Sequence, residues 1–232
     1  MGRSRLAIGA AVAAVILAGV GVSATLLLRA HTAPPQLALG TPSPAGSPSA
    51  LDGTWSVGSG SIVGYRVKEK FINQPAETEA VARTSSVNGS LMVAVQGSTV
   101  RISQMNFTVD LASLASQDRY ATYQAYQRDF FIRNIYLETS RFPTATFDAA
   151  AFSFSLAVGR PVSVDIDGKL TLHGVTRDVT AHAQAQSAGS QAEVAGSITL
   201  DMRDFGIDPP NISFTRSEPV ATIEYDLKLT HA

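Results

Sequence analysis

The chain has 232 residues, a formal net charge of -1 and no cysteine. This length allows one large domain or two small ones, and the balanced charge lacks the basic excess of a nucleic-acid-binding surface. The absence of cysteine excludes a disulfide framework, a thiolate metal site, a cysteine nucleophile and a lipid anchor on an N-terminal cysteine. We therefore expect no nucleic-acid partner.

The first segment has the composition of a membrane helix. Residues 6–28 form an uncharged run rich in Ala, Val, Leu, Ile and Gly, and about 20 apolar residues cross a bilayer as a helix. Arg3 and Arg5 precede the run, which predicts a cytoplasmic N-terminus and an exported remainder. We expect residues 1–30 to be a signal anchor in the cell membrane. Because Val22-Ser23-Ala24 resembles a cleavage site, the alternative is a signal peptide and a secreted protein.

Residues 31–50 are predicted to be a linker. Small and polar residues separate its five prolines, which are Pro34, Pro35, Pro42, Pro44 and Pro48. This composition cannot bury a core and is typical of a semi-extended tether. We expect it to hold a domain of residues 51–232 away from the membrane, on the extracytoplasmic side.

From residue 51 onward, apolar and polar residues alternate, which is the period of a β-strand. In residues 162–172 the apolar set is Val162, Val164, Ile166, Leu170 and Leu172. Similar alternation occurs in residues 61–70, 87–95, 99–110, 178–186, 193–202 and 223–229. Turn signals lie at residues 58–60, 88–89, 159–161, 173–174 and 188–190. About eight strands with one solvated face predict an antiparallel barrel or sandwich.

The alternation slips by one position within residues 99–110. Val100 and Ile102 begin the apolar face, but Met105, Phe107 and Val109 continue it. One extra residue in a strand produces such a slip, so the sequence predicts a β-bulge near Ser103-Gln104.

One helical segment is expected between residues 113 and 138. Ser116 is the predicted N-cap, with Asp118 in the first turn, and Phe142-Pro143 prevents the helix from continuing. Residues 144–147 then favour a strand. An aromatic stripe packs on the barrel or closes a ligand cavity, and it consists of Tyr120, Tyr123, Tyr126 and Phe130.

The sequence contains no clear catalytic or metal-binding motif. It has no Gly-x-Ser-x-Gly nucleophile elbow. His173 and His182 flank a turn and are expected to be solvated, because a zinc site would need further ligands. Asp165-x-Asp167-Gly168 carries only part of a calcium-loop pattern. We predict no catalytic residue, no metal ligand and no resident cofactor.

Several stretches together resemble the YceI-like family of lipocalin-like, isoprenoid-binding proteins. Arg-Asp-Phe-Phe-Ile-Arg at residues 128–133 resembles its Arg-Asp-x-x-[Ile/Leu]-Arg helix. Residues 168–179 resemble its Gly-x-Leu-Thr-[Ile/Leu]-x-Gly-Val-Thr hairpin. The further matching stretches are residues 53–67, 109–114, 137–147 (in a form associated with actinobacterial members) and 205–207. The resemblance covers residues 51–230, and Phe130 and Phe131 depart from the small or polar residues that commonly follow Arg-Asp.

The resemblance implies an all-β fold, an eight-stranded antiparallel lipocalin-like barrel with one helical segment at its mouth, preceded here by the predicted membrane helix. A barrel of eight strands has room inside for one small ligand. The family's ligands imply that an isoprenoid or another amphiphilic lipid is held in the barrel. The oligomeric state stays open, a homodimer included.

The candidate ligand-binding residues form two groups. Arg128, Asp129 and Arg133 share one side of the helix and are candidates for binding the head group, because arginine binds phosphate through paired hydrogen bonds. The alternative is that Arg128, Asp129, Glu138 and Arg141 form salt bridges that pin the helix to the barrel. The candidate cavity wall consists of Phe107, Phe130, Phe147, Val164, Ile166, Leu170, Leu172, Ile198, Leu200, Ile223, Tyr225 and Leu227.

Three functions follow from these expectations. The first is extracytoplasmic binding of a polyisoprenoid or similar lipid for transport, storage or shielding, without catalysis. The second is an enzyme that acts on an isoprenoid lipid. The third is a barrel filled by its own side chains that serves as a surface interaction module.

Overall fold

The computed structural model describes residues 33–41, 51–72, 76–118, 125–155, 160–212 and 215–231. The predicted membrane helix of residues 6–28 lies outside these ranges, as do Tyr120 and Tyr123. Among the described residues, no helix combines the length and apolar character needed to cross a membrane.

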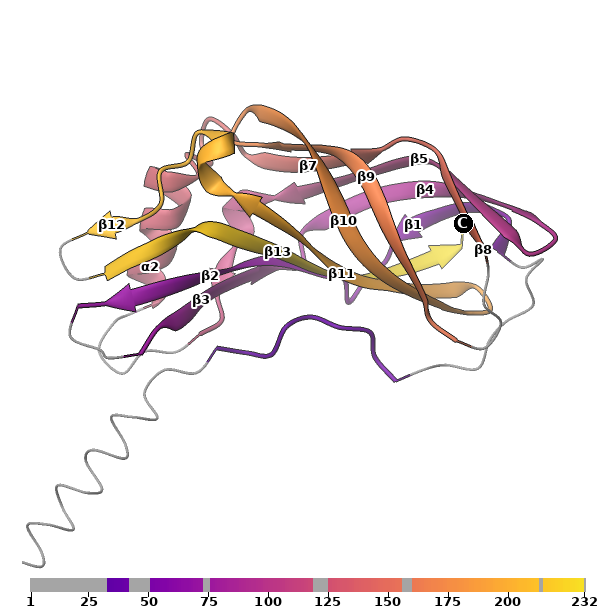
Figure 1. Ribbon diagram of the computed structural model, residues 1–232, viewed down its shortest axis with the longest axis horizontal. Coiled ribbons are helices and arrows are strands. Elements are labelled where there is room, and N and C mark those ends of the chain that lie inside the picture. Colours follow the sequence, from indigo (N-terminus) through magenta and orange to yellow (C-terminus); the bar gives the residue numbers. More distant parts are fainter. Residues whose placement is uncertain are drawn as a thin grey trace, which may run out of the picture.

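The described strands form one antiparallel sheet that curls round on itself (Figure 1). Its thirteen strands within these ranges are β1 (Gly53–Val57), β2 (Ile62–Phe71), β3 (Thr78–Thr84), β4 (Val87–Gln96), β5 (Thr99–Asp110), β6 (Ala115–Ser116), β7 (Thr144–Ala149), β8 (Phe152–Ser155), β9 (Val162–Leu172), β10 (Val175–Ala188), β11 (Gln191–Asp201), β12 (Asn211–Ile212) and β13 (Thr215–His231). The helical elements are η2 (Leu111–Ser113), α2 (Ala125–Phe131), η3 (Ile132–Tyr136) and η4 (Met202–Phe205).

Eight of the described strands close into a barrel, in the order β1-β4-β5-β7-β9-β10-β11-β13. The ring closes because β13 pairs back onto β1, with Trp55 opposite His231 and Val57 opposite Leu229. This arrangement confirms the closed eight-stranded antiparallel barrel that the sequence and the resemblance predicted, and it removes free sheet edges from the ring.

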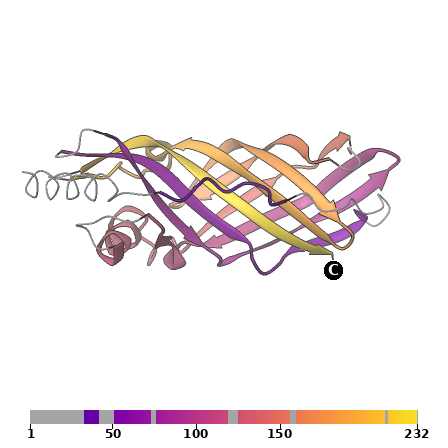
Figure 2. The same cartoon turned by 90° about the horizontal axis from the view of Figure 1, so that it is seen from below.

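The end of the barrel away from the pairing of β1 with β13 is built differently. Residues 215–226 of β13 pair with β2, which pairs with β3, which in turn pairs with β6. Helix α2 lies beside β6 at this end (Figures 1 and 2). We call this the helix end, and we call the end where β1 joins β13 the β1 end.

Most of the predicted strands are confirmed, and so is the bulge. Ser90 pairs with Asn106 but Met92 pairs with Ser103, so one residue of β4 faces two of β5. Gln104 at this point has a φ of 52°. Residues 173 and 174 also have positive φ values, of 51° and 73°, which suits the tight hairpin turn between β9 and β10.

Two local predictions were wrong, and two short strands were not predicted. Asn88-Gly89 does not form a turn but lies inside β4, because the chain turns one step earlier, at residues 85–86. Ser116 is not an N-cap: it lies in β6, where pairing with β3 outweighs its capping preference. The short strands β3 and β8 were not predicted, since their composition carries little alternation.

Apolar side chains gather in two clusters, one toward each end of the barrel. Trp55, Leu91 and Leu229 belong to the cluster at the β1 end. Leu111, Phe205 and Ile207 belong to the cluster at the helix end. Trp55 is 1% exposed, and its indole nitrogen donates to the Leu51 carbonyl at 2.8 Å.

Trp55→Ala is expected to lower the free energy of unfolding by about 3–5 kcal/mol, because it leaves a cavity next to the seam between β1 and β13. Urea denaturation measures this change. Met92→Ala is the control, since Met92 is 39% exposed on β4. A loss below about 1 kcal/mol for Trp55→Ala would contradict the importance of this seam.

Candidate functional site

An apolar cavity of about 250 Å³ lies inside the barrel. Residues of both hydrophobic clusters line it, so it extends between them along the barrel. Its wall includes eleven of the twelve residues predicted for it, namely Phe107, Phe147, Val164, Ile166, Leu170, Leu172, Ile198, Leu200, Ile223, Tyr225 and Leu227. Contact of these residues with a ligand stays a prediction.

Phe130 is the exception among the predicted wall residues. Its side chain is 57% exposed and it does not line the cavity. Its ring contacts Phe131, another exposed residue of α2, with the ring centroids 5.9 Å apart. The helix reaches the cavity through η3 instead, where Ile132 and Tyr136 are wall residues. Helical spacing alone did not reveal which side of the segment faces the barrel.

Polar groups enter this cavity at the helix end. Tyr65, Val67 and Glu69 alternate inward along β2 and all three line the cavity. Ser217 of β13 lies directly opposite Glu69 and is also a wall residue. Among the described residues, the buried Ser217 hydroxyl has no hydrogen-bond partner. Such a group is a candidate partner for a ligand, because a buried hydroxyl without a partner costs free energy.

The wall also carries three tyrosine hydroxyls, which are uncharged or hydrogen-bonded. Burial raises the pKa of Tyr65 well above its ordinary value, although the Arg128 charge opposes this. Burial raises the pKa of Tyr136 as well. Toward the β1 end of the cavity, the Tyr225 hydroxyl donates to the His182 carbonyl at 3.0 Å. Glu69 and Ser217, together with the hydroxyls of Tyr65 and Tyr136, are therefore the polar groups that line the cavity near the helix end.

Arg128 is buried and lies in a network of ion pairs and hydrogen bonds. Its guanidinium pairs with both carboxylate oxygens of Asp118, at 2.8 Å for Nη1, and lies 3.8 Å from Glu69. Its Nε donates to the Ser116 hydroxyl at 3.1 Å. Asp118 in turn accepts from the Val81 N–H of β3 at 3.0 Å. Arg128 therefore ties α2 to β2, β3 and β6, and it does not line the cavity.

Asp129 and Arg133 make similar structural contacts. Asp129 accepts from the Ser116 backbone N–H at 3.0 Å and from its hydroxyl at 2.5 Å. Arg133 donates to the backbone carbonyls of Asp129 and Ala112, at 3.1 Å and 3.0 Å. Neither residue lines the cavity. The three head-group candidates thus lie together at the helix end, and binding of a head group by them stays a prediction. Of the residues in the alternative interpretation, Arg128 forms salt bridges that tie the helix to the barrel.

The other charged residues considered in the sequence lie apart from the cavity. Arg141 and Glu138 pair with each other at 3.7 Å, and the Arg141 side chain is 73% exposed. His182 is exposed and contacts Asp165 at 2.7 Å. His173 was expected to be solvated, but it lies largely buried against Phe142, with ring centroids 4.6 Å apart. In the described part of the chain no three acidic or histidine side chains are grouped to hold a metal ion.

Of the two polar cavity residues that were missed, Glu69 had a signal in the sequence. Glu69 continues the inward alternation of Val63, Tyr65 and Val67 in the predicted strand of residues 61–70. An acidic residue in phase with an apolar face marks a buried charge. Ser217 gave no such signal, because only the register of β13 against β2 places it opposite Glu69.

A model of the YceI-like domain family matches residues 60–230. The chain belongs to this family. It is 38% identical over 88 residues to a UPF0312 protein of Pseudomonas aeruginosa, a match covering 35% of this chain and 44% of the relative. A UPF0312 protein of Pseudomonas paraeruginosa is 36% identical over a stretch of the same length. The chain therefore spans less than half the length of these curated relatives.

A solved structure shows the same fold. A polyisoprenoid binding domain from Saccharophagus degradans superposes with a TM-score of 0.53 at 14% identity, covering 77% of this chain and 98% of that one. BcnA of Burkholderia cenocepacia gives a lower TM-score of 0.47 at 16% identity, covering 72% and 95% of the two chains. At 14% identity, the similarity to the Saccharophagus domain shows a shared fold and does not identify the ligand of this YceI-like chain.

Arg128→Ala is expected to cost about 3–5 kcal/mol of stability, because it leaves the buried carboxylates of Asp118 and Glu69 without their cation. Chemical denaturation of the ligand-free protein measures this cost. Arg141→Ala is the matched control and should change stability by less than about 1 kcal/mol, since its ion pair is exposed. Equal stability of the two variants would contradict the structural role of Arg128.

Proposed function

We propose that this YceI-like protein binds one isoprenoid-type amphiphile inside its barrel, with the chain in the cavity and an uncharged head at the helix end. The observation that carries the proposal is the apolar cavity between the two hydrophobic clusters. A protein of the same fold that is described as polyisoprenoid-binding supports the choice of lipid. A wall of aliphatic and aromatic side chains favours a hydrocarbon, because burial stabilises it by about 25 cal/mol per Å².

The volume of the cavity limits the ligand. About 250 Å³ lies just below the range of roughly 300–1,000 Å³ that is common for small-molecule pockets. We therefore propose that a single chain occupies it, and that a longer isoprenoid requires the wall to widen or leaves part of its chain outside. The cavity also argues against a barrel filled by its own side chains.

The charges at the helix end favour a neutral head group. Glu69 is the charged residue among the cavity-lining residues described, and Ser217 lies opposite it. Arg128 pairs with both Asp118 and Glu69, and it does not line the cavity. A phosphate would meet a like charge here, whereas a hydroxyl or carbonyl could hydrogen-bond to Ser217.

We further propose that this binding takes place outside the cytoplasm, for transport, storage or shielding of the lipid. The support is the apolar run of residues 6–28 with arginines before it. Tethering by this run, and any homodimer, remain predictions. We propose that the lipid is bound without catalysis.

Ala183→Phe is expected to abolish lipid binding, because Ala183 lines the cavity and a phenyl ring would fill much of it. Mass spectrometry of an organic extract of the protein, purified without detergent from its native host, detects the lipid. Gln184→Phe is the control, since Gln184 is exposed on the same strand. An isoprenoid in the wild type and in Gln184→Phe, but not in Ala183→Phe, would support the proposal. The absence of lipid from all three, even after incubation with host lipids, would overturn it.

The head-group preference has a separate test. We expect geranylgeraniol to bind at least roughly tenfold tighter than geranylgeranyl phosphate, because the phosphate faces Glu69. Glu69→Gln should narrow this ratio, while Asp167→Asn on the outside of β9 should leave it unchanged. Fluorescence competition measures both affinities. Tighter binding of the phosphate by the wild type would contradict the neutral head.

A further inference from the structure

Glu224 is buried on the side of the wall that should face solvent. Its neighbours Ile223 and Tyr225 line the cavity, so Glu224 points outward from β13. It is nevertheless 0% exposed. The reason is that residues 33–41 lie across the outside of the barrel (Figures 1 and 2). We call these residues the strap.

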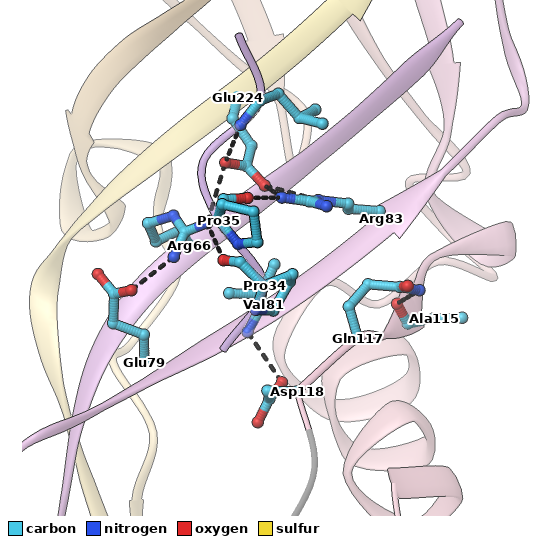
Figure 3. A network of polar contacts seen from close by, with 11 residues as sticks. Pro34, Pro35, Arg66, Glu79, Val81, Arg83, Ala115, Gln117, Asp118 and Glu224 are labelled. Carbon is cyan, nitrogen blue, oxygen red and sulfur yellow. Dashed lines mark hydrogen bonds and ion pairs between the residues drawn. The ribbon is translucent and has the colours of Figure 1, made fainter. Parts of the chain in front are cut away.

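The first half of the strap is held by two arginines and Glu224 (Figure 3). Arg66 of β2 donates to the Pro34 carbonyl at 2.9 Å, and Arg83 of β3 donates to the Pro35 carbonyl at 2.5 Å. The same arginines contact Glu224, at 3.3 Å and 2.8 Å. Glu224 also accepts from the strap's Leu37 N–H at 3.2 Å. A buried carboxylate is tolerable only with such partners.

The second half of the strap is held by Glu193 of β11. This carboxylate accepts from the Gly40 N–H at 2.7 Å and from Lys228 at 2.6 Å. Partial burial would raise the pKa of Glu193, but the hydrogen bonds from Lys228, Gly40 and Gln186 lower it below its ordinary value. The Gln186 side chain also donates to the Gly40 carbonyl at 3.4 Å. The strap therefore contacts five strands, β3, β2, β13, β11 and β10.

The backbone contacts and the prolines indicate an extended conformation of the strap. The strap turns backbone groups of Pro34, Pro35, Leu37 and Gly40 toward the barrel. Pro34-Pro35 favours the polyproline II conformation, because proline fixes its own φ at about −65° and pushes the residue before it towards an extended backbone. A segment in this conformation makes no internal hydrogen bonds, so its carbonyls and amides are free to bond to the barrel.

We propose that the outer wall around Arg66, Arg83, Glu224 and Glu193 is a binding site for an extended, proline-containing peptide, and that the strap is its ligand within the same chain. In this site Arg66 and Arg83 donate to two successive carbonyls of the strap. Glu224 and Glu193 accept from two of its backbone amides. The site is separate from the lipid cavity, so it stands whether or not the barrel binds a lipid.

The bound strap determines where the chain meets the barrel. The strap runs from the helix end toward the β1 end along the outside of the barrel (Figure 1). This part of the predicted linker therefore lies along the barrel wall.

Leu37→Pro in the full chain tests the site, because proline keeps the extended conformation but removes the N–H that Glu224 accepts. Hydrogen exchange at the Gly40 amide is the readout. We expect exchange there to become roughly tenfold faster, as for the loss of one hydrogen bond to a charged group. Ala38→Pro is the matched control: Ala38 is exposed and its N–H makes none of these contacts. Equal exchange in the wild type and both variants would overturn the proposal.

Binding of the strap in trans is the second test. A fluorescent peptide of residues 32–42 is added to the Leu37→Pro chain and its anisotropy is measured. We expect saturable binding, at least roughly tenfold weaker for a peptide that itself carries Leu37→Pro. Absence of binding, or equal binding of both peptides, would show that the wall does not recognise this segment and would overturn the proposal.

Discussion

The pairing of β13 along its whole length is the constraint on which the rest of this structure depends. One edge of this strand pairs with β11, and the other edge pairs first with β2 and then with β1. Pairing with β1 closes the ring, and pairing with β2 brings Ser217 opposite Glu69. Because side chains alternate across a strand, the same strand carries cavity residues on one face and Glu224 on the other.

The two ends of the barrel differ in how they are stabilised and in which polar groups they offer to a ligand. At the β1 end Trp55 and its apolar neighbours seal the ring. At the helix end the covering elements are held by buried ion pairs around Arg128, whose members must stay together because an unpaired buried charge is costly. An arginine engaged in this way positions the helix, and the polar contacts left to a ligand come from β2 and β13 instead.

A barrel wall has two faces, and here both carry recognition groups. The inner face is mostly apolar and carries Glu69, Ser217 and a few hydroxyl groups, which suits a hydrocarbon chain with a small polar head. The outer face around Glu224 is polar, but it is covered by the strap and satisfied by backbone groups. Both sites depend on the same alternation in β2 and β13, where Tyr65 points inward and Arg66 outward.

The sequence by itself determined the all-β class, most strands, the bulge near Gln104 and nearly all of the apolar wall, because alternation with a period of two is a local property of the chain. Only the tertiary structure decided that Phe130 points away from the cavity, that Arg128 pairs with Asp118, and that Ser217 faces Glu69. It also decided that residues 33–41 lie on the barrel. These features join residues far apart in the chain, and their pairing follows from strand register and ring closure, which local patterns do not encode.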